Sequence, residues 1–120
     1  MLSRKQKAYM NVARFLAAKS SMRHKHGAVV VKSGRVVGMG YNKARNHPDV
    51  VTEGKHREQC GYHAEAVAIK EAGINARGAT IFVARINRQG EDLLSKPCEM
   101  CQKTIEESGL KNVLFTRSDP

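Results

Sequence analysis

The sequence is poor in the residues that mark secreted, membrane-bound and base-stacking proteins. Its 120 residues include no tryptophan, three phenylalanines and three tyrosines, so few aromatic rings are available to stack on nucleic-acid bases. Three cysteines are an odd number and cannot form a closed disulfide framework, so we expect free thiols. The longest apolar runs, 27–31 and 79–84, fall far short of the ~20 residues that span a membrane. We therefore expect a cytoplasmic protein without a membrane partner.

Acidic residues are absent from the first 48 positions, which contain 11 lysines and arginines. Residues 49–120 are nearly balanced, with 10 basic and 11 acidic residues, so the formal net charge of +10 arises in the first part of the chain. A one-sided basic field attracts anions, which makes nucleotides, nucleic acids and acidic surfaces candidate partners. The alternative is that the lysines and arginines only solvate one face.

Hydrophobic patterning predicts short helices and strands in alternation. Apolar residues recur with a helical period over residues 3–19, where Ser3 can cap the helix. β-Branched runs on both sides of a Ser-Gly turn predict a hairpin over residues 26–41. We further expect a helix over 63–72, a strand over 79–84, a turn at 87–90, a helix over 98–108 and a strand over 112–116. The polar segment 42–61 is predicted to be a loop that borders the functional site.

The order α-β-β-α-β-α-β predicts a single α/β domain over residues 1–120. Strands separated by helices of about ten residues favour parallel crossovers, whereas the hairpin is antiparallel. The predicted sheet is therefore mixed.

Two short motifs stand where successive helices are predicted to begin, His-x-Glu at residues 63–65 and Pro-Cys-x-x-Cys at residues 97–101. His63, Cys98 and Cys101 would supply one imidazole and two thiolates, a donor set that suits zinc. Three protein ligands leave the fourth tetrahedral position to water, which is typical of a catalytic zinc site. The start of a helix is also expected to lower the pKa of the two thiols. The alternatives are a structural zinc site and a redox cysteine pair.

Glu65 follows His63 by two residues and can reach a zinc-bound water without being a ligand itself. A carboxylate in that position can take a proton from the water and pass it to a leaving amine. The alternative is an acidic residue that only stabilises the helix start through the macrodipole.

With these motifs the sequence resembles the cytidine/deoxycytidylate deaminase superfamily of zinc enzymes. Arg23, the Gly-Ala-Val segment at 27–29 and the Gly-Tyr-Asn segment at 40–42 are similar to the deoxycytidylate branch. The resemblance implies a three-layer α-β-α sandwich. Family members often continue with a further strand and helix after the strand at 112–116, and the printed sequence ends at Pro120, so we expect a minimal version of the fold.

The resemblance also implies an activity and roles for particular residues. It implies Zn²⁺ held by His63, Cys98 and Cys101, with Glu65 as the proton shuttle. It further implies that Asn42 contacts the substrate sugar and that the Ala64 backbone helps to hold the pyrimidine. The implied reaction is hydrolysis of a small nucleotide by zinc-activated water, with deoxycytidylate (dCMP) converted to deoxyuridylate (dUMP). A homo-oligomer is the expected assembly.

Other hypotheses remain open at this stage. The basic first part would also suit a deaminase of cytosine in single-stranded DNA or RNA, or of adenosine in tRNA. A zinc-stabilised binding or assembly module without catalysis is a third possibility. Asn42 could simply close the hairpin, and the basic segment 23–26 could either bind a phosphate or be a solvated turn. Finally, Cys60 with His47 or His56 could form a second zinc site.

Overall fold

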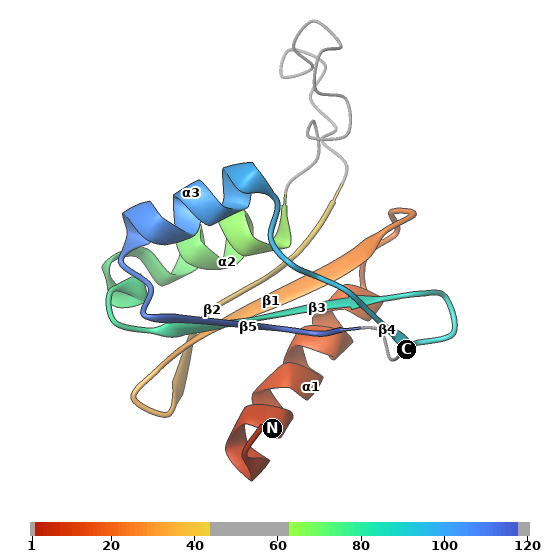
Figure 1. Cartoon of the computed structure of the whole chain (residues 1–120), viewed down its shortest axis with the longest axis horizontal. Helices are drawn as coiled ribbons and strands as arrows, with labels where there is room; N and C mark the ends of the chain where they lie inside the picture. Colours follow the sequence, from red (N-terminus) through yellow and green to blue (C-terminus); the bar gives the residue numbers. More distant parts are fainter. Residues whose placement is uncertain (1, 44–62, 118–120) are drawn as a thin grey trace, which may run out of the picture.

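The structure is a computed structural model that describes residues 2–43 and 63–117. A five-stranded mixed sheet lies between helix α1 on one face and helices α2 and α3 on the other (Figure 1). The predicted three-layer α-β-α sandwich is therefore confirmed. In chain order the elements are α1 (Arg4–Ala18), β1 (Lys25–Lys32), β2 (Arg35–Tyr41), α2 (Ala64–Ala72), a short 3₁₀ helix (Gly73–Ala76), β3 (Thr80–Ile86), β4 (Asp92–Leu93), α3 (Glu99–Ser108) and β5 (Asn112–Phe115).

The sheet combines antiparallel and parallel pairs, as the element order predicts. Strand β1 lies between β2 and β3 and is antiparallel to both. The other edge of β3 pairs with β5 in parallel along its first half and with the two-residue strand β4 at its end. Neither β4 nor the 3₁₀ helix was predicted, because elements of two to four residues are too short to show a period.

Alternation along β1 and β3 divides the core between the two faces. Val29 and Phe82 pack with α1, whereas Val30 and Ile81 pack with α2 and α3. Successive side chains of a strand point to opposite faces, so each face receives every second residue of these two strands. Their continuous apolar runs are thus explained by burial on both sides.

Two glycines let the helices approach the sheet closely. A Cβ atom on Gly27 of β1 would collide with the Ala13 carbonyl oxygen of α1. A Cβ atom on Gly38 of β2 would likewise collide with the Ala68 carbonyl oxygen of α2. The absence of a side chain at these positions therefore sets the depth at which α1 and α2 pack.

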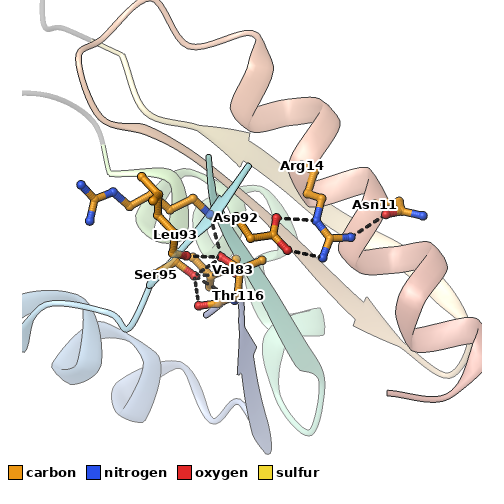
Figure 2. A network of polar contacts seen from close by, with 8 residues as sticks. Asn11, Arg14, Val83, Asp92, Leu93, Ser95 and Thr116 are labelled. Carbon is orange, nitrogen blue, oxygen red and sulfur yellow. Dashed lines mark hydrogen bonds and ion pairs between the residues drawn. The ribbon is translucent and has the colours of Figure 1, made fainter. Parts of the chain in front are cut away.

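The segment between β3 and α3 is fixed by polar contacts on two sides (Figure 2). On the α1 side, Asp92 accepts two hydrogen bonds from Arg14, both 2.8 Å long. On the other side, the buried Ser95 hydroxyl donates to the Val83 carbonyl (2.8 Å) and accepts from the Thr116 amide (3.1 Å). The Pro-Cys-x-x-Cys motif begins two residues after Ser95, so these contacts hold the chain that leads into it.

We expect the Ser95→Ala substitution to lower the free energy of unfolding by about 0.5–1.5 kcal/mol, because it removes the hydrogen bonds of a buried hydroxyl, while the Thr116 amide keeps its bond to the Val83 carbonyl (3.0 Å). Urea unfolding measures the change. Ser108→Ala is the matched control: its hydroxyl donates to the Ile105 carbonyl within α3, and we expect a change below about 0.5 kcal/mol. Equal effects at the two positions would contradict a special role for Ser95.

Candidate metal centre and substrate cavity

The two sequence motifs meet at the starts of α2 and α3. His63 is the N-cap residue of α2, Cys98 is the N-cap residue of α3, and Cys101 lies in the first turn of α3. His63 Nδ1 is 3.3 Å from Cys101 Sγ and 3.9 Å from Cys98 Sγ. The three ligand atoms all lie within 4.8 Å of one another. The imidazole thus presents Nδ1 to the sulfurs, while Nε2 is buried without a hydrogen-bond partner among the described residues.

This donor set fits a zinc ion. One nitrogen and two sulfurs have the softness that zinc prefers, and their spacing allows all three to bind one ion. Burial raises the pKa of the Cys101 thiol, and the neighbouring Glu65 and Cys98 raise it further. The prediction that the helix start lowers the Cys101 pKa is therefore wrong for the protein alone, because burial outweighs the macrodipole. A divalent cation supplies the positive charge that a buried thiolate requires.

Glu65 is buried beside the three ligands, with 5% of its surface exposed. Burial raises the pKa of its carboxyl, while its own backbone amide, His63 and a hydrogen bond with Cys101 partly oppose that shift. A carboxylate whose pKa is raised is a stronger base, and it therefore takes a proton from water more readily than an ordinary surface carboxylate does. The environment therefore suits a group that transfers protons better than one that only stabilises a helix end.

A cavity of about 470 Å³ opens beside these groups. It brings together residues far apart in the sequence, including Asn42 and Ala64, which the resemblance had implied in substrate binding. The Asn42 side chain accepts a hydrogen bond from the His26 amide (2.8 Å) and donates one to the His24 carbonyl. Asn42 thus closes the end of the hairpin and lines the cavity as well. The cavity is lined by Met22, Arg23, His24, His26, Asn42, His63, Ala64, Glu65, Arg85, Lys96 and Cys98.

Part of this lining was not predicted from the sequence. Arg85 and Lys96 were not singled out, because neither belongs to a motif. The register between β1 and β3 explains why Arg85 is there. On the face that α2 and α3 cover, the paired residues are first Val30 with Ile81, then Ala28 with Val83, and finally His26 with Arg85. The apolar face thus becomes polar at its last pair, where it meets the cavity. The predicted second zinc site with Cys60, His47 or His56 lies outside the described residues.

His26 is expected to make stability depend on pH. Burial, followed by the charges of Arg85, His24 and His63, lowers the pKa of His26 to about 4 from 6.5. Between these two values the unfolded chain binds the proton and the folded chain does not, so stability falls as the pH falls. From pH 7 to pH 5 we expect a loss of about 2 kcal/mol from this residue.

Urea unfolding of the zinc-loaded protein and of the His26→Gln variant at the two pH values measures this contribution. Protonation of Glu65 and of the metal ligands is common to both proteins and cancels in the difference. The same loss of stability in both proteins would contradict the assignment to His26.

The three-layer fold, the His-Cys-Cys donor set and the buried glutamate together define the class of the domain, an α/β domain with a zinc centre at the starts of two helices. The family model of the cytidine and deoxycytidylate deaminase zinc-binding region matches residues 3–117. The chain therefore belongs to this family.

Individual relatives share the domain at moderate identity. The riboflavin biosynthesis protein RibD of Aquifex aeolicus is 32% identical over 130 aligned positions, which cover 100% of this chain and 30% of that protein. The dCMP deaminase of the cyanophage S-TIM5 in its apo form has a TM-score of 0.71 and 26% identity, covering 96% of this chain and 84% of that one. A diaminohydroxyphosphoribosylaminopyrimidine deaminase/5-amino-6-(5-phosphoribosylamino)uracil reductase of Thermotoga maritima has a TM-score of 0.61 and 28% identity, covering 95% and 30%.

The chain spans 20–30% of the length of two RibD proteins that it matches in sequence. Within residues 2–43 and 63–117, no helix is long and apolar enough to cross a membrane.

Proposed function

We propose that this chain catalyses the zinc-dependent hydrolytic deamination of an aminopyrimidine nucleotide, with dCMP as the preferred substrate and dUMP as its product. The observation that carries the proposal is the position of the buried Glu65 next to three ligand atoms that lie within 4.8 Å of one another, at the wall of a cavity. A structural zinc site would need neither the cavity nor a carboxylate that does not bind the metal.

His63 Nδ1, Cys98 Sγ and Cys101 Sγ are the atoms that would hold the ion. Zinc bound there would acidify a water molecule, and so supply a nucleophile at neutral pH. Glu65 would accept one proton from that water and deliver it to N3 of the pyrimidine. It would then carry the second proton, from the new C4 hydroxyl, to the departing amine. A C–O bond forms at C4, the C4–N bond breaks, and ammonia leaves.

Two further residues would orient the substrate. Ala64 is the first residue of α2, where a backbone amide has no acceptor within the helix. It can therefore donate to the pyrimidine. The Asn42 side chain bonds to His24 and His26, and it keeps one amide hydrogen and one lone pair of its oxygen for further hydrogen bonds. These can bond to the sugar. Both residues line the cavity.

A second candidate substrate comes from the relatives. The name of the Thermotoga protein points to a diaminohydroxyphosphoribosylaminopyrimidine, which is also an aminopyrimidine nucleotide. Its deamination would use the same zinc site and the same proton transfers, so the geometry of the metal centre does not favour one of these two bases.

Ammonia release tests the proposal. The zinc-loaded protein is incubated in parallel with dCMP, deoxycytidine, a cytosine-containing single strand and the diaminopyrimidine nucleotide. Release from dCMP alone supports the preferred substrate, and release from the diaminopyrimidine alone replaces it with the second candidate. Release from the strand alone would indicate that the basic first part of the chain binds nucleic acid. No release from any of the four would contradict the proposed activity.

A further inference from the structure

Arg85 carries a positive charge that no described carboxylate neutralises. Among residues 2–43 and 63–117, the one arginine or lysine that forms a salt bridge is Arg14, which pairs with Asp92. Arg85 Nη2 instead lies 2.8 Å from His24 Nδ1, and Nη1 is 3.5 Å from the Leu94 carbonyl. Its Nε is buried and has no hydrogen-bond partner within the described residues. Because a guanidinium is always protonated, this group keeps a full charge and an unused donor.

The surroundings of Arg85 add to its positive potential. The cavity that it lines is also lined by Arg23, His24, His26 and Lys96. Glu65 is the one carboxylate among the described lining residues. The charge of Arg85 contributes to the lowered pKa of His26, which also lines the cavity. A site of this composition favours a ligand with negative charge.

Arg85 is also held firmly by its backbone. It lies in β3 opposite His26 of β1 and opposite Leu93 of β4. Its amide donates to the Thr116 hydroxyl at 3.0 Å, and that hydroxyl donates in turn to the Leu93 carbonyl at 2.7 Å. The hydrogen-bond network of Figure 2 therefore fixes the strand position from which the guanidinium extends. The contacts of the guanidinium with His24 and the Leu94 carbonyl restrain the side chain as well, and a restrained donor loses less conformational entropy when it binds a ligand than a mobile surface lysine does.

We propose that Arg85 is the specificity-determining residue of the cavity and that it binds the phosphate monoester of the nucleotide substrate. The planar guanidinium presents Nε and a terminal nitrogen as parallel donors, which match two oxygens of one phosphate group. Arg23 and Lys96, which line the same cavity, supply further positive charge. The identity of the base rests on the proposed function, whereas the phosphate site rests on the contacts of Arg85 and on the basic lining of the cavity.

Equilibrium binding to a zinc-loaded protein tests the proposal without turnover. Calorimetry is performed in a Glu65→Gln background with dCMP and with deoxycytidine, before and after the Arg85→Gln substitution. We expect Arg85→Gln to weaken dCMP binding by about 10- to 100-fold, which is the loss expected when a hydrogen bond between two charged groups is removed. The affinity for deoxycytidine should stay within about twofold. Arg85→Lys keeps the charge but lacks the paired donors of the guanidinium. Its affinity for dCMP is expected to lie between that of the Glu65→Gln protein and that of the variant that also carries Arg85→Gln.

The control is Arg88→Gln, which removes an equal charge from the exposed turn after β3. Arg88 does not line the cavity, so the affinities for dCMP and for deoxycytidine are expected to equal those of the Glu65→Gln protein. Zinc content and the thermal midpoint of each variant report whether it is folded. An equal loss for dCMP and deoxycytidine would overturn the proposal, since it would make Arg85 a structural residue. An unchanged preference for dCMP would overturn it as well.

Two further ligands separate this proposal from the proposed function. If neither dCMP nor deoxycytidine binds, the cytosine substrate is wrong, and inorganic phosphate then decides the question. Phosphate binding that Arg85→Gln abolishes and Arg88→Gln preserves would uphold the anion site, and no phosphate binding would overturn it. A loss confined to a cytosine-containing single strand would overturn the assignment to a phosphate monoester in favour of a nucleic-acid backbone.

Discussion

Replacing Glu65 with glutamine is expected to lower kcat by about 10²- to 10⁴-fold while one zinc ion per chain is retained. Glutamine preserves the size of the side chain and removes its ability to take up and release a proton. Because Glu65 lies beside the ligand atoms without belonging to the His-Cys-Cys group, the loss should fall on the chemical step. Steady-state kinetics with dCMP, together with zinc analysis of the purified variant, measures both parts of the prediction.

The control for this experiment is Glu99→Gln. Glu99 also lies in the first turn of a helix at the zinc centre, between the two cysteines, but its side chain is exposed. We expect kcat of this variant to stay within about twofold of the wild-type value, since a surface charge in the first turn contributes mainly to the helix macrodipole. If Glu65→Gln kept full activity, or if it lost zinc together with activity, the assigned role in proton transfer would be contradicted.

Replacing Cys101 with serine is expected to remove zinc and with it much of the stability of the folded chain. Cys101 is buried and its sulfur is the closest to His63 Nδ1, at 3.3 Å. An ion that binds only the folded state stabilises it in proportion to the logarithm of its affinity. We therefore expect the free energy of unfolding in the presence of zinc to fall by at least about 3 kcal/mol. Zinc analysis and thermal unfolding with and without a chelator provide the measurement.

The chelator provides an internal check on this second prediction. It should lower the thermal midpoint of the wild-type protein and leave that of Cys101→Ser nearly unchanged, because the variant has no tightly bound ion to lose. Met100→Ala serves as the matched control, since this residue lies between the two cysteines with 45% of its surface exposed. It should bind zinc and respond to the chelator like the wild type. Stoichiometric zinc in Cys101→Ser would show that the ion is held by other residues.

The sequence was sufficient for those parts of the fold and site that depend on local patterns. The predicted helix starts at residues 63 and 98 were one residue early, because His63 and Cys98 are N-cap residues, which precede the first helical turn. Both motifs nevertheless lie at helix starts and meet in space, as predicted. The hairpin and the buried strand were found because runs of β-branched residues extend over several positions.

Other features depend on information that no local pattern contains. The pairing of His26 with Arg85 follows from the register of β1 against β3, and the register is fixed by packing on both faces of the sheet. Arg85 therefore could not be assigned to the cavity from its neighbours in the sequence. The Cys101 pKa was predicted in the wrong direction for a related reason, since the macrodipole can be inferred from a helix start but the depth of burial cannot.

The central claim is that the chain holds a zinc ion at a site with one position open to solvent. X-ray absorption at the zinc edge of the metal-loaded protein tests it most directly, because the spectrum distinguishes sulfur ligands from lighter atoms. We predict two sulfur ligands, from Cys98 and Cys101, one imidazole nitrogen from His63, and one light atom from solvent. A third sulfur in the spectrum, for which Cys60 is the remaining cysteine of the chain, would close the site and contradict a catalytic zinc centre.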